Sequence, residues 1–202
     1  MKIRLIISSL CILSLGIAHS QNFRAGILAG VAGTQVDGDG LSGYDKGGLN
    51  FGGLSNFKWN DRWSSQFEIT YFQKGCRSPF DSTGTRIDYR LHLHYIEIPV
   101  LMIYHFKLKG RWMAESGFSF AKLLDSKFEQ DGIEYEGNFK KYDYDYLLGV
   151  GYALGSKLFL NLRFSYSVTP IAPSIYHARQ FFGPGQFNNV LGFSLRYYFK
   201  SF

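Results

Sequence analysis

Five charged residues occupy the polar faces of segments in which large apolar side chains recur at every second position. They are Glu68, Glu97, Glu115, Arg163 and Arg196. Residues two apart share one face of an extended strand, so each charge lies opposite the apolar face of its own segment. Carboxylates and guanidiniums that are buried together must pair, and these residues therefore predict an ion-paired network. Arg24 has the same parity and is a further candidate member.

Two histidines, His92 and His94, also share one face of a strand, and such a pair can ligate a metal ion. No third ligand stands at a diagnostic spacing, so we interpret them as rim residues and expect no metal or other cofactor. The sequence contains no G-x-S-x-G, and its histidines lack a serine and a carboxylate in matching layers. We therefore predict that the protein is not an enzyme.

Two further segments have an unusual composition. Phe128–Tyr146 is rich in acidic and aromatic residues, which suits either a site for cations or a partner, or a solvated surface loop. We favour the loop, because loops are commonly polar and mobile. Pro170–Phe187 contains three prolines and several aromatic residues. It is a candidate to fold over a mouth or to contact an unknown protein partner.

Eight strand-like segments carry these residues. The last shows the pattern most clearly, because Leu191, Phe193, Leu195, Tyr197 and Phe199 alternate with small, polar or charged residues. The eight segments are Asn22–Gln35, Gly47–Trp59, Arg62–Gly75, Arg90–Phe106, Arg111–Leu124, Tyr144–Leu154, Lys157–Thr169 and Asn188–Phe199. Most of them have one apolar face and one face that tolerates a charge.

The connections between these segments alternate in length. The long ones are Val36–Lys46, Cys76–Tyr89, Asp125–Asp143 and Pro170–Phe187, and the short ones are Asn60-Asp61, Lys107–Gly110 and Gly155-Ser156. Short turns at one end and long loops at the other are typical of outer-membrane barrels. The sequence therefore predicts an all-β fold, an eight-stranded antiparallel up-and-down transmembrane β-barrel. Its apolar faces would contact lipid and its charges would line the lumen.

The charge network then has two interpretations. It either fills and closes the lumen, or it lines an ion path or a gate. We favour the structural role, because side chains just about fill the interior of an eight-stranded barrel.

The first twenty residues are typical of a secretory signal peptide. Lys2 and Arg4 precede an apolar run, and Ala18 and Ser20 match the small-residue pattern of a cleavage site. We therefore predict a signal peptide over residues 1–20, cleaved near Ser20, and a barrel domain over residues 21–202 in the cell outer membrane.

Composition limits the partners. The formal net charge of +6 falls to +4 without Lys2 and Arg4, and the basic residues are scattered, so no nucleic-acid partner is expected. Cys76 would be the only cysteine after cleavage, which excludes an intramolecular disulfide. An aromatic content of 18% fits two aromatic girdles. The expected partners are outer-membrane lipid and the outer-membrane assembly machinery, and the expected state is a monomer.

Two motifs resemble those of a known family. Leu93 to Leu101 reads LHYIEIPVL and is similar to LxYLEIPLLL, while Phe67 to Gly75 reads FEITYFQKG and is similar to xELxYxQKG. Together with Gly149-Val150-Gly151-Tyr152, they resemble the PorT-like outer-membrane β-barrel family of Bacteroidetes-type bacteria. The resemblance implies an eight-stranded barrel, and most members have no assigned activity. The ending Lys200-Ser201-Phe202 departs from the family, which often stops on the aromatic residue.

Pro99 lies inside a predicted strand, where it removes a hydrogen-bond donor. We therefore predict a β-bulge beside Glu97 and Pro99, which would also explain why Leu101 and Ile103 fall on the polar face.

The functional prediction is an integral outer-membrane barrel with a structural or interaction role and surface-exposed loops. One alternative is a narrow pore or small-solute binder. Another is a soluble lipocalin-like barrel that binds apolar ligands, and this alternative requires a polar exterior.

Overall fold

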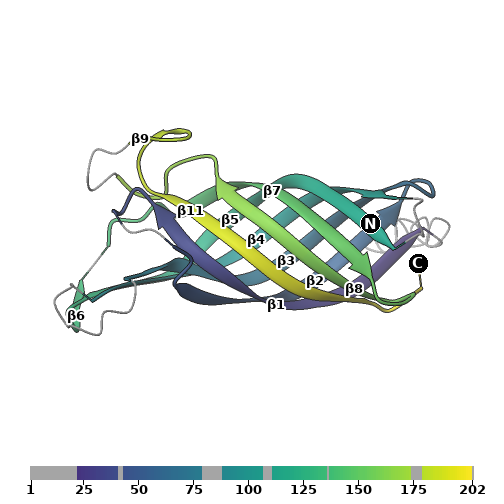
Figure 1. Cartoon of the computed structure of the whole chain (residues 1–202), viewed down its shortest axis with the longest axis horizontal. Coiled ribbons are helices and arrows are strands. Elements are labelled where there is room, and N and C mark those ends of the chain that lie inside the picture. The colour runs from purple at the N-terminus through teal and green to yellow at the C-terminus, as the bar shows by residue number, and fades with distance from the viewer. Residues whose placement is uncertain are drawn as a thin grey trace, which may run out of the picture.

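Long strands make up most of the described part of the chain, which in the computed structural model comprises residues 22–40, 43–78, 88–106, 111–135, 137–173 and 179–201 (Figure 1). The eight long strands are β1 (Phe23–Asp37), β2 (Lys46–Lys58), β3 (Trp63–Arg77), β4 (Tyr89–His105), β5 (Trp112–Gln130), β7 (Tyr142–Ala153), β8 (Leu158–Ser167) and β11 (Phe187–Tyr198). Three short strands lie between them: β6 (Ile133–Tyr135), β9 (Arg179–Gln180) and β10 (Gly183–Pro184). The predicted signal peptide, residues 1–20, lies outside the described residues.

The eight long strands close into a barrel. Each pairs antiparallel with its neighbours in the chain, β1 also pairs with β11, and β4 with β5, so the ring has no free edge (Figure 1). The first and last strands meet where β11 pairs with β1, and just beyond β11 the Phe199 backbone N–H donates to the Ala25 carbonyl oxygen at 2.9 Å. The predicted fold is therefore confirmed.

The two ends of the barrel differ. The turn end carries the short connections between β2 and β3, β4 and β5, and β7 and β8, and the loop end carries the long ones. In the first turn, the Asn60 carboxamide oxygen accepts hydrogen bonds from the backbone N–H groups of Arg62 and Trp63, at 2.8 and 3.0 Å. The predicted turn Lys107–Gly110 lies outside the described residues.

The outer face of the barrel is apolar. Exposed side chains of this face include Ile27, Val31, Leu162, Leu195 and Phe193, while the residues between them turn inward and are mostly buried. Aromatic contacts occur toward both ends of the barrel. At the turn end, Trp63 packs on Tyr104 and Trp112 packs on Tyr152, each with ring centroids 4.9 Å apart, and toward the loop end Phe120 packs on Tyr142 at 5.4 Å. Because the exterior is apolar, the lipocalin-like alternative is wrong. Within the described residues, no helix is long and apolar enough to cross a membrane.

The predicted bulge at Pro99 is wrong. β3 and β4 keep one register throughout, from Trp63↔Tyr104 to Arg77↔Arg90. The missing proline N–H instead interrupts the ladder, since pairing skips from Phe67↔Val100 to Thr70↔Glu97 without a shift. Leu101 and Ile103 face inward and are buried because the turn end of the lumen is apolar. A register shift occurs instead in the pairing of β4 with β5, between His94 and Tyr95.

Two predicted loops contain strands. β5 continues to Gln130, past the expected end at Leu124, and forms a hairpin with β6. β7 begins at Tyr142, so Asp143 and Asp145 are buried strand residues rather than part of a solvated loop. In the segment Pro170–Phe187, β9 and β10 pair as a small hairpin at the loop end (Figure 1).

Candidate functional site in the barrel lumen

A four-residue ion-pair network crosses the lumen. Arg163 on β8 donates through Nη1 and Nη2 to both carboxylate oxygens of Glu68 on β3, at 2.8 and 2.9 Å, and through Nε to Glu115 Oε1 at 2.8 Å. Arg196 on β11 donates to both carboxylate oxygens of Glu115 on β5, at 2.7 and 3.0 Å. Its Nη2 also lies 3.5 Å from Glu68 Oε1. We call these residues the arginine network.

This network is balanced in charge and almost fully buried. Two guanidiniums face two carboxylates, and the exposed side-chain fraction is 0% for both glutamates, 1% for Arg196 and 10% for Arg163. Bidentate guanidinium–carboxylate pairs fix geometry as well as charge. Gly149 on β7 provides space for the Glu115 carboxylate, because an added Cβ at this position would lie 2.7 Å from Glu115 Oε1.

Glu97 belongs to a different cluster. Its Oε2 lies 3.3 Å from the Lys74 ammonium, which also lies 2.5 Å from Asp145 Oδ2 and 3.6 Å from Asp143 Oδ2. All four side chains are at most 2% exposed. We call them the lysine cluster, and Glu97 is the one of the five predicted network residues that the structure separates from the rest.

The lysine cluster is not balanced by its own charges. One ammonium faces three carboxylates, and neutral donors also contact the two aspartates. Ser119 and Ser167 donate to Asp145 at 3.1 and 3.2 Å, and the Asn188 carboxamide donates to Asp143 at 2.7 Å.

Sequence reasoning missed Lys74, Asp143 and Asp145 as members of a site. The alternation of β3 could have identified Lys74, because it lies an even number of residues from Glu68 and therefore on the same inward face. The two aspartates were grouped with their acidic neighbours in the chain and interpreted as part of a polar loop. Arg24, the further candidate member, is buried on β1 near the turn end.

Apolar side chains occupy the lumen on both sides of these charges. Toward the turn end, one buried cluster includes Leu54, Ile103 and Phe159. Toward the loop end, another includes Leu91 and Leu93. A cavity beside Arg163 and Asn161 measures about 20 Å³, which is space for about one water molecule.

The two rim histidines lie on the outer face of β4. The His94 Nδ1 atom is hydrogen-bonded to the Tyr71 hydroxyl on β3, and the two rings lie with centroids 5.9 Å apart. Among the described residues, no group of three histidine, cysteine or acidic side chains is placed to hold a metal ion.

A closed barrel with a lipid-facing apolar surface and a charged, filled lumen defines an integral outer-membrane β-barrel protein. Residues 19–172 match the family described as outer membrane protein beta-barrel domain, and the chain belongs to this family. By the usual asymmetry of such barrels, the turn end faces the periplasm and the loop end faces the cell exterior.

Two solved structures of one bacterial protein show the same fold. Ail, the attachment invasion locus protein of Yersinia pestis, is 14% identical, and the match covers 89% of this chain and 100% of that one with a TM-score of 0.53. Ail in complex with the heparin analogue sucrose octasulfate matches with the same identity and coverage and a TM-score of 0.52. Neisserial surface protein A is 15% identical, with 87% and 96% of the two chains covered and a TM-score of 0.46. No curated protein sequence matches this chain.

Proposed function

We propose that this barrel neither conducts nor catalyses, and that it serves as a rigid membrane anchor that presents its long loops at the cell surface. The observation that carries the proposal is the filled lumen. The arginine network and the lysine cluster join opposite walls, and apolar clusters lie on either side of them. Ion pairs this deeply buried support a lumen without a continuous aqueous path.

Conductance in planar bilayers tests this proposal against the narrow-pore alternative. The purified, folded protein is expected to give no channel steps, with a porin in the same bilayer as the positive control. Reproducible steps that depend on protein concentration would support a pore lined by the charges instead. Steps that appear only after Glu68 and Glu115 are both replaced by alanine would show that the arginine network closes the lumen.

The exposed aromatic side chains of the loop end support a role in interaction. Phe181, between β9 and β10, is 87% exposed and packs edge-on against Phe182, with ring centroids 4.9 Å apart. Phe182 also packs on Tyr166, with ring centroids 6.0 Å apart, so these aromatic side chains form a group, and contiguous exposed apolar surface marks sites of interaction. We propose that an unidentified protein partner binds here. Replacement of both phenylalanines by serine is expected to abolish binding of cells to such a partner without affecting barrel folding.

We also propose that the chain is PorT-like within its family. The two motifs that carry the resemblance meet in the lumen, since Lys74 of the first motif pairs with Glu97 of the second. Gly75 completes the first motif with a φ of 128°, and a Cβ there would lie 2.1 Å from the Leu91 carbonyl oxygen. The motif residues thus have a packing reason to occur together.

The remaining expectations concern export and assembly. We propose that the signal peptide is cleaved near Ser20, that the assembly machinery reads the C-terminal aromatic residues, and that the folded barrel is a monomer in lipid. Mass spectrometry of the protein from outer membranes tests the first of these, with a mature N-terminus at Gln21 as the expected result.

A further inference from the structure

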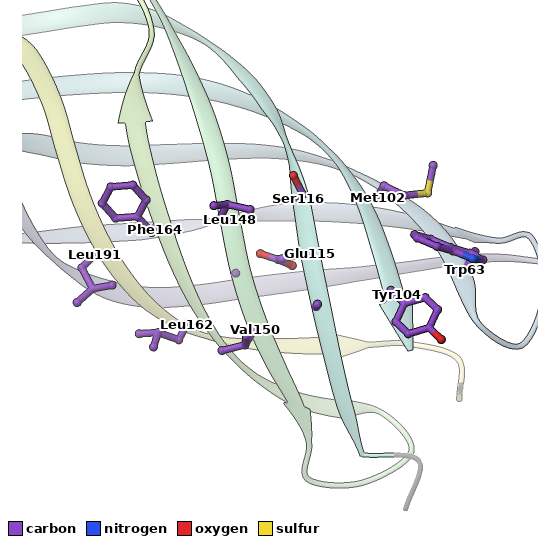
Figure 2. Close-up of a pocket in the computed structure, with 12 residues that line it drawn as sticks. Trp63, Met102, Tyr104, Glu115, Ser116, Leu148, Val150, Leu162, Phe164 and Leu191 are labelled. Carbon is purple, nitrogen blue, oxygen red and sulfur yellow. The ribbon is translucent and has the colours of Figure 1, made fainter. Parts of the chain in front are cut away.

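A groove runs along the lipid-facing side of the barrel near the turn end. Its volume is about 670 Å³. Figure 2 shows Leu148, Val150 and Phe164 on one side of it and Met102 and Tyr104 on the other. Trp63, Leu162 and Leu191 extend the same surface.

The floor of the groove is formed by small residues of β5. Ala114 lies between Tyr104 of β4 and Val150 of β7, and Ser116 lies between Met102 and Leu148 in the same register. Each small side chain is thus flanked on both sides by a large apolar one. The difference in side-chain size makes a furrow along the strand, and its walls are apolar.

The groove lies within the apolar belt, so the molecules that reach it in the membrane are lipids. A narrow furrow with apolar walls fits an extended hydrocarbon chain. The Ser116 hydroxyl in the floor is already paired with the Tyr146 hydroxyl at 3.0 Å. An acyl chain in the groove would therefore leave no polar group of the floor without a partner.

A basic residue stands at the periplasmic mouth of the groove. Arg111 directly precedes β5, is exposed, and has no ion-pair partner among the described residues, although its Nη1 donates to the Tyr152 hydroxyl at 3.3 Å. Ala114 and Ser116 lie three and five residues farther along the strand, which is roughly 10–17 Å at the rise of an extended chain. That separation places the guanidinium at headgroup level when an acyl chain fills the groove.

We propose that the groove binds one acyl chain of an anionic phospholipid of the periplasmic leaflet, with the headgroup phosphate at Arg111. Charge complementarity favours this occupant over a second copy of the chain. Two copies in one membrane are related by an axis along the membrane normal, so a symmetric contact through this groove would bring two Arg111 side chains together at the same rim. Like charges would oppose that contact, whereas a phosphate is attracted.

Trp63 provides a fluorescence test, because it lines the groove. The chain has three tryptophans, so a variant with Trp59→Phe and Trp112→Phe keeps Trp63 alone. It is folded into phosphatidylcholine vesicles that contain a small fraction of phosphatidylglycerol with brominated acyl chains, which quench tryptophan on contact. Quenching is expected to exceed that by the same fraction of brominated phosphatidylcholine, because the groove selects the anionic lipid.

Three substitutions in this background sharpen the test. Ala114→Leu fills the floor of the groove and is expected to abolish the excess quenching. Ala29→Leu makes the same change at an exposed position of the outer face, on β1, and should leave the excess unchanged. Arg111→Gln leaves the groove open and is expected to lower the apparent affinity for phosphatidylglycerol about five-fold, the effect of one basic residue near an anionic surface.

Heat-modifiable migration on a gel establishes that each variant is folded, and Ser116→Val replaces Ala114→Leu if the latter does not fold. Equal quenching by the two brominated lipids would overturn the proposal, as would excess quenching that survives the groove-filling substitution. Cross-linked dimers that disappear with Ala114→Leu would assign the groove to a second copy and would overturn it as well. None of these outcomes depends on whether the lumen conducts.

Discussion

The arginine network and the lysine cluster are two solutions to the same problem, which is to bury ionised groups inside a barrel. The network matches two guanidiniums to two carboxylates through bidentate contacts. The cluster surrounds a single ammonium with three carboxylates and adds neutral donors. The guanidinium has five donors in a fixed plane and can bridge two acids, whereas the ammonium is a point charge that contacts several oxygens at once.

The difference indicates that the two regions depend on their members unequally. In the arginine network, every charge has a counter-charge, and the loss of either sign leaves a residue unpaired. In the lysine cluster, negative charge is in excess. Loss of the single cation should therefore destabilise the barrel strongly, whereas loss of any one of the three carboxylates should not. Substitutions of the same type should therefore have different consequences in the two places.

The largest effect is expected for Lys74→Met. This change leaves Glu97, Asp143 and Asp145 buried without a cation, and removal of one partner from a buried pair costs roughly 3–5 kcal/mol. We expect a loss of stability at or above the upper end of that range, measured by urea unfolding in lipid vesicles. Lys74→Arg, which keeps the charge, should lose less, and equal losses for the two variants would contradict an electrostatic role.

Glu115→Gln should have the next largest effect. It removes one of the two negative charges from the arginine network, so the only carboxylate left to Arg196 is that of Glu68, at 3.5 Å. The expected loss is about 3 kcal/mol in the same unfolding experiment. The double variant with Arg196→Met should recover part of this loss, because it restores the balance of charge. No recovery would show that the two residues act independently.

Gly149→Ala tests whether the arginine network is as tightly packed as its distances imply. The new methyl group would lie 2.7 Å from Glu115 Oε1 and 2.9 Å from the Leu162 carbonyl oxygen. Overpacking of this kind costs about 1–3 kcal/mol, and we expect a lowered unfolding midpoint. Gly53→Ala is the matched control, because a Cβ there meets nothing within 4 Å. Equal unfolding midpoints for both variants would mean that the arginine network can shift to accommodate the methyl group at little cost in stability.

Glu97→Gln should have the smallest effect. It uses the same substitution as Glu115→Gln but removes a carboxylate from the cluster with excess negative charge. The amide keeps an oxygen toward the Lys74 ammonium, and two carboxylates still face that ammonium, so we expect a change in unfolding free energy of about 1 kcal/mol, the net value of one hydrogen bond. A loss as large as that of Glu115→Gln would show that all three carboxylates of the lysine cluster are needed.

Much of this architecture was predictable from local pattern. The period of two in segments such as Lys157–Thr169 predicts both the strand and the inward position of Arg163, and the unequal connections predict the two ends. The prediction at Pro99 was wrong because a missing N–H removes hydrogen bonds without shifting the register. Asp143 was assigned to a loop, and Asp145 to both the acidic segment Phe128–Tyr146 and the strand Tyr144–Leu154. The composition around them resembles a loop, although their alternation with tyrosines favours a strand.

Pattern along the chain therefore determines which face each residue of this barrel takes, because side-chain direction in a strand depends only on neighbouring residues. It does not determine which charges meet. Glu97 pairs with Lys74 rather than with either arginine, and Asp145 reaches Lys74 from 71 residues away in the chain. Those partners are fixed by the closure of β4 on β5 and by the stagger between strands, which set the height of each inward side chain in the lumen. The face that each charge takes follows from the sequence pattern, whereas its partner follows from the closure of the barrel.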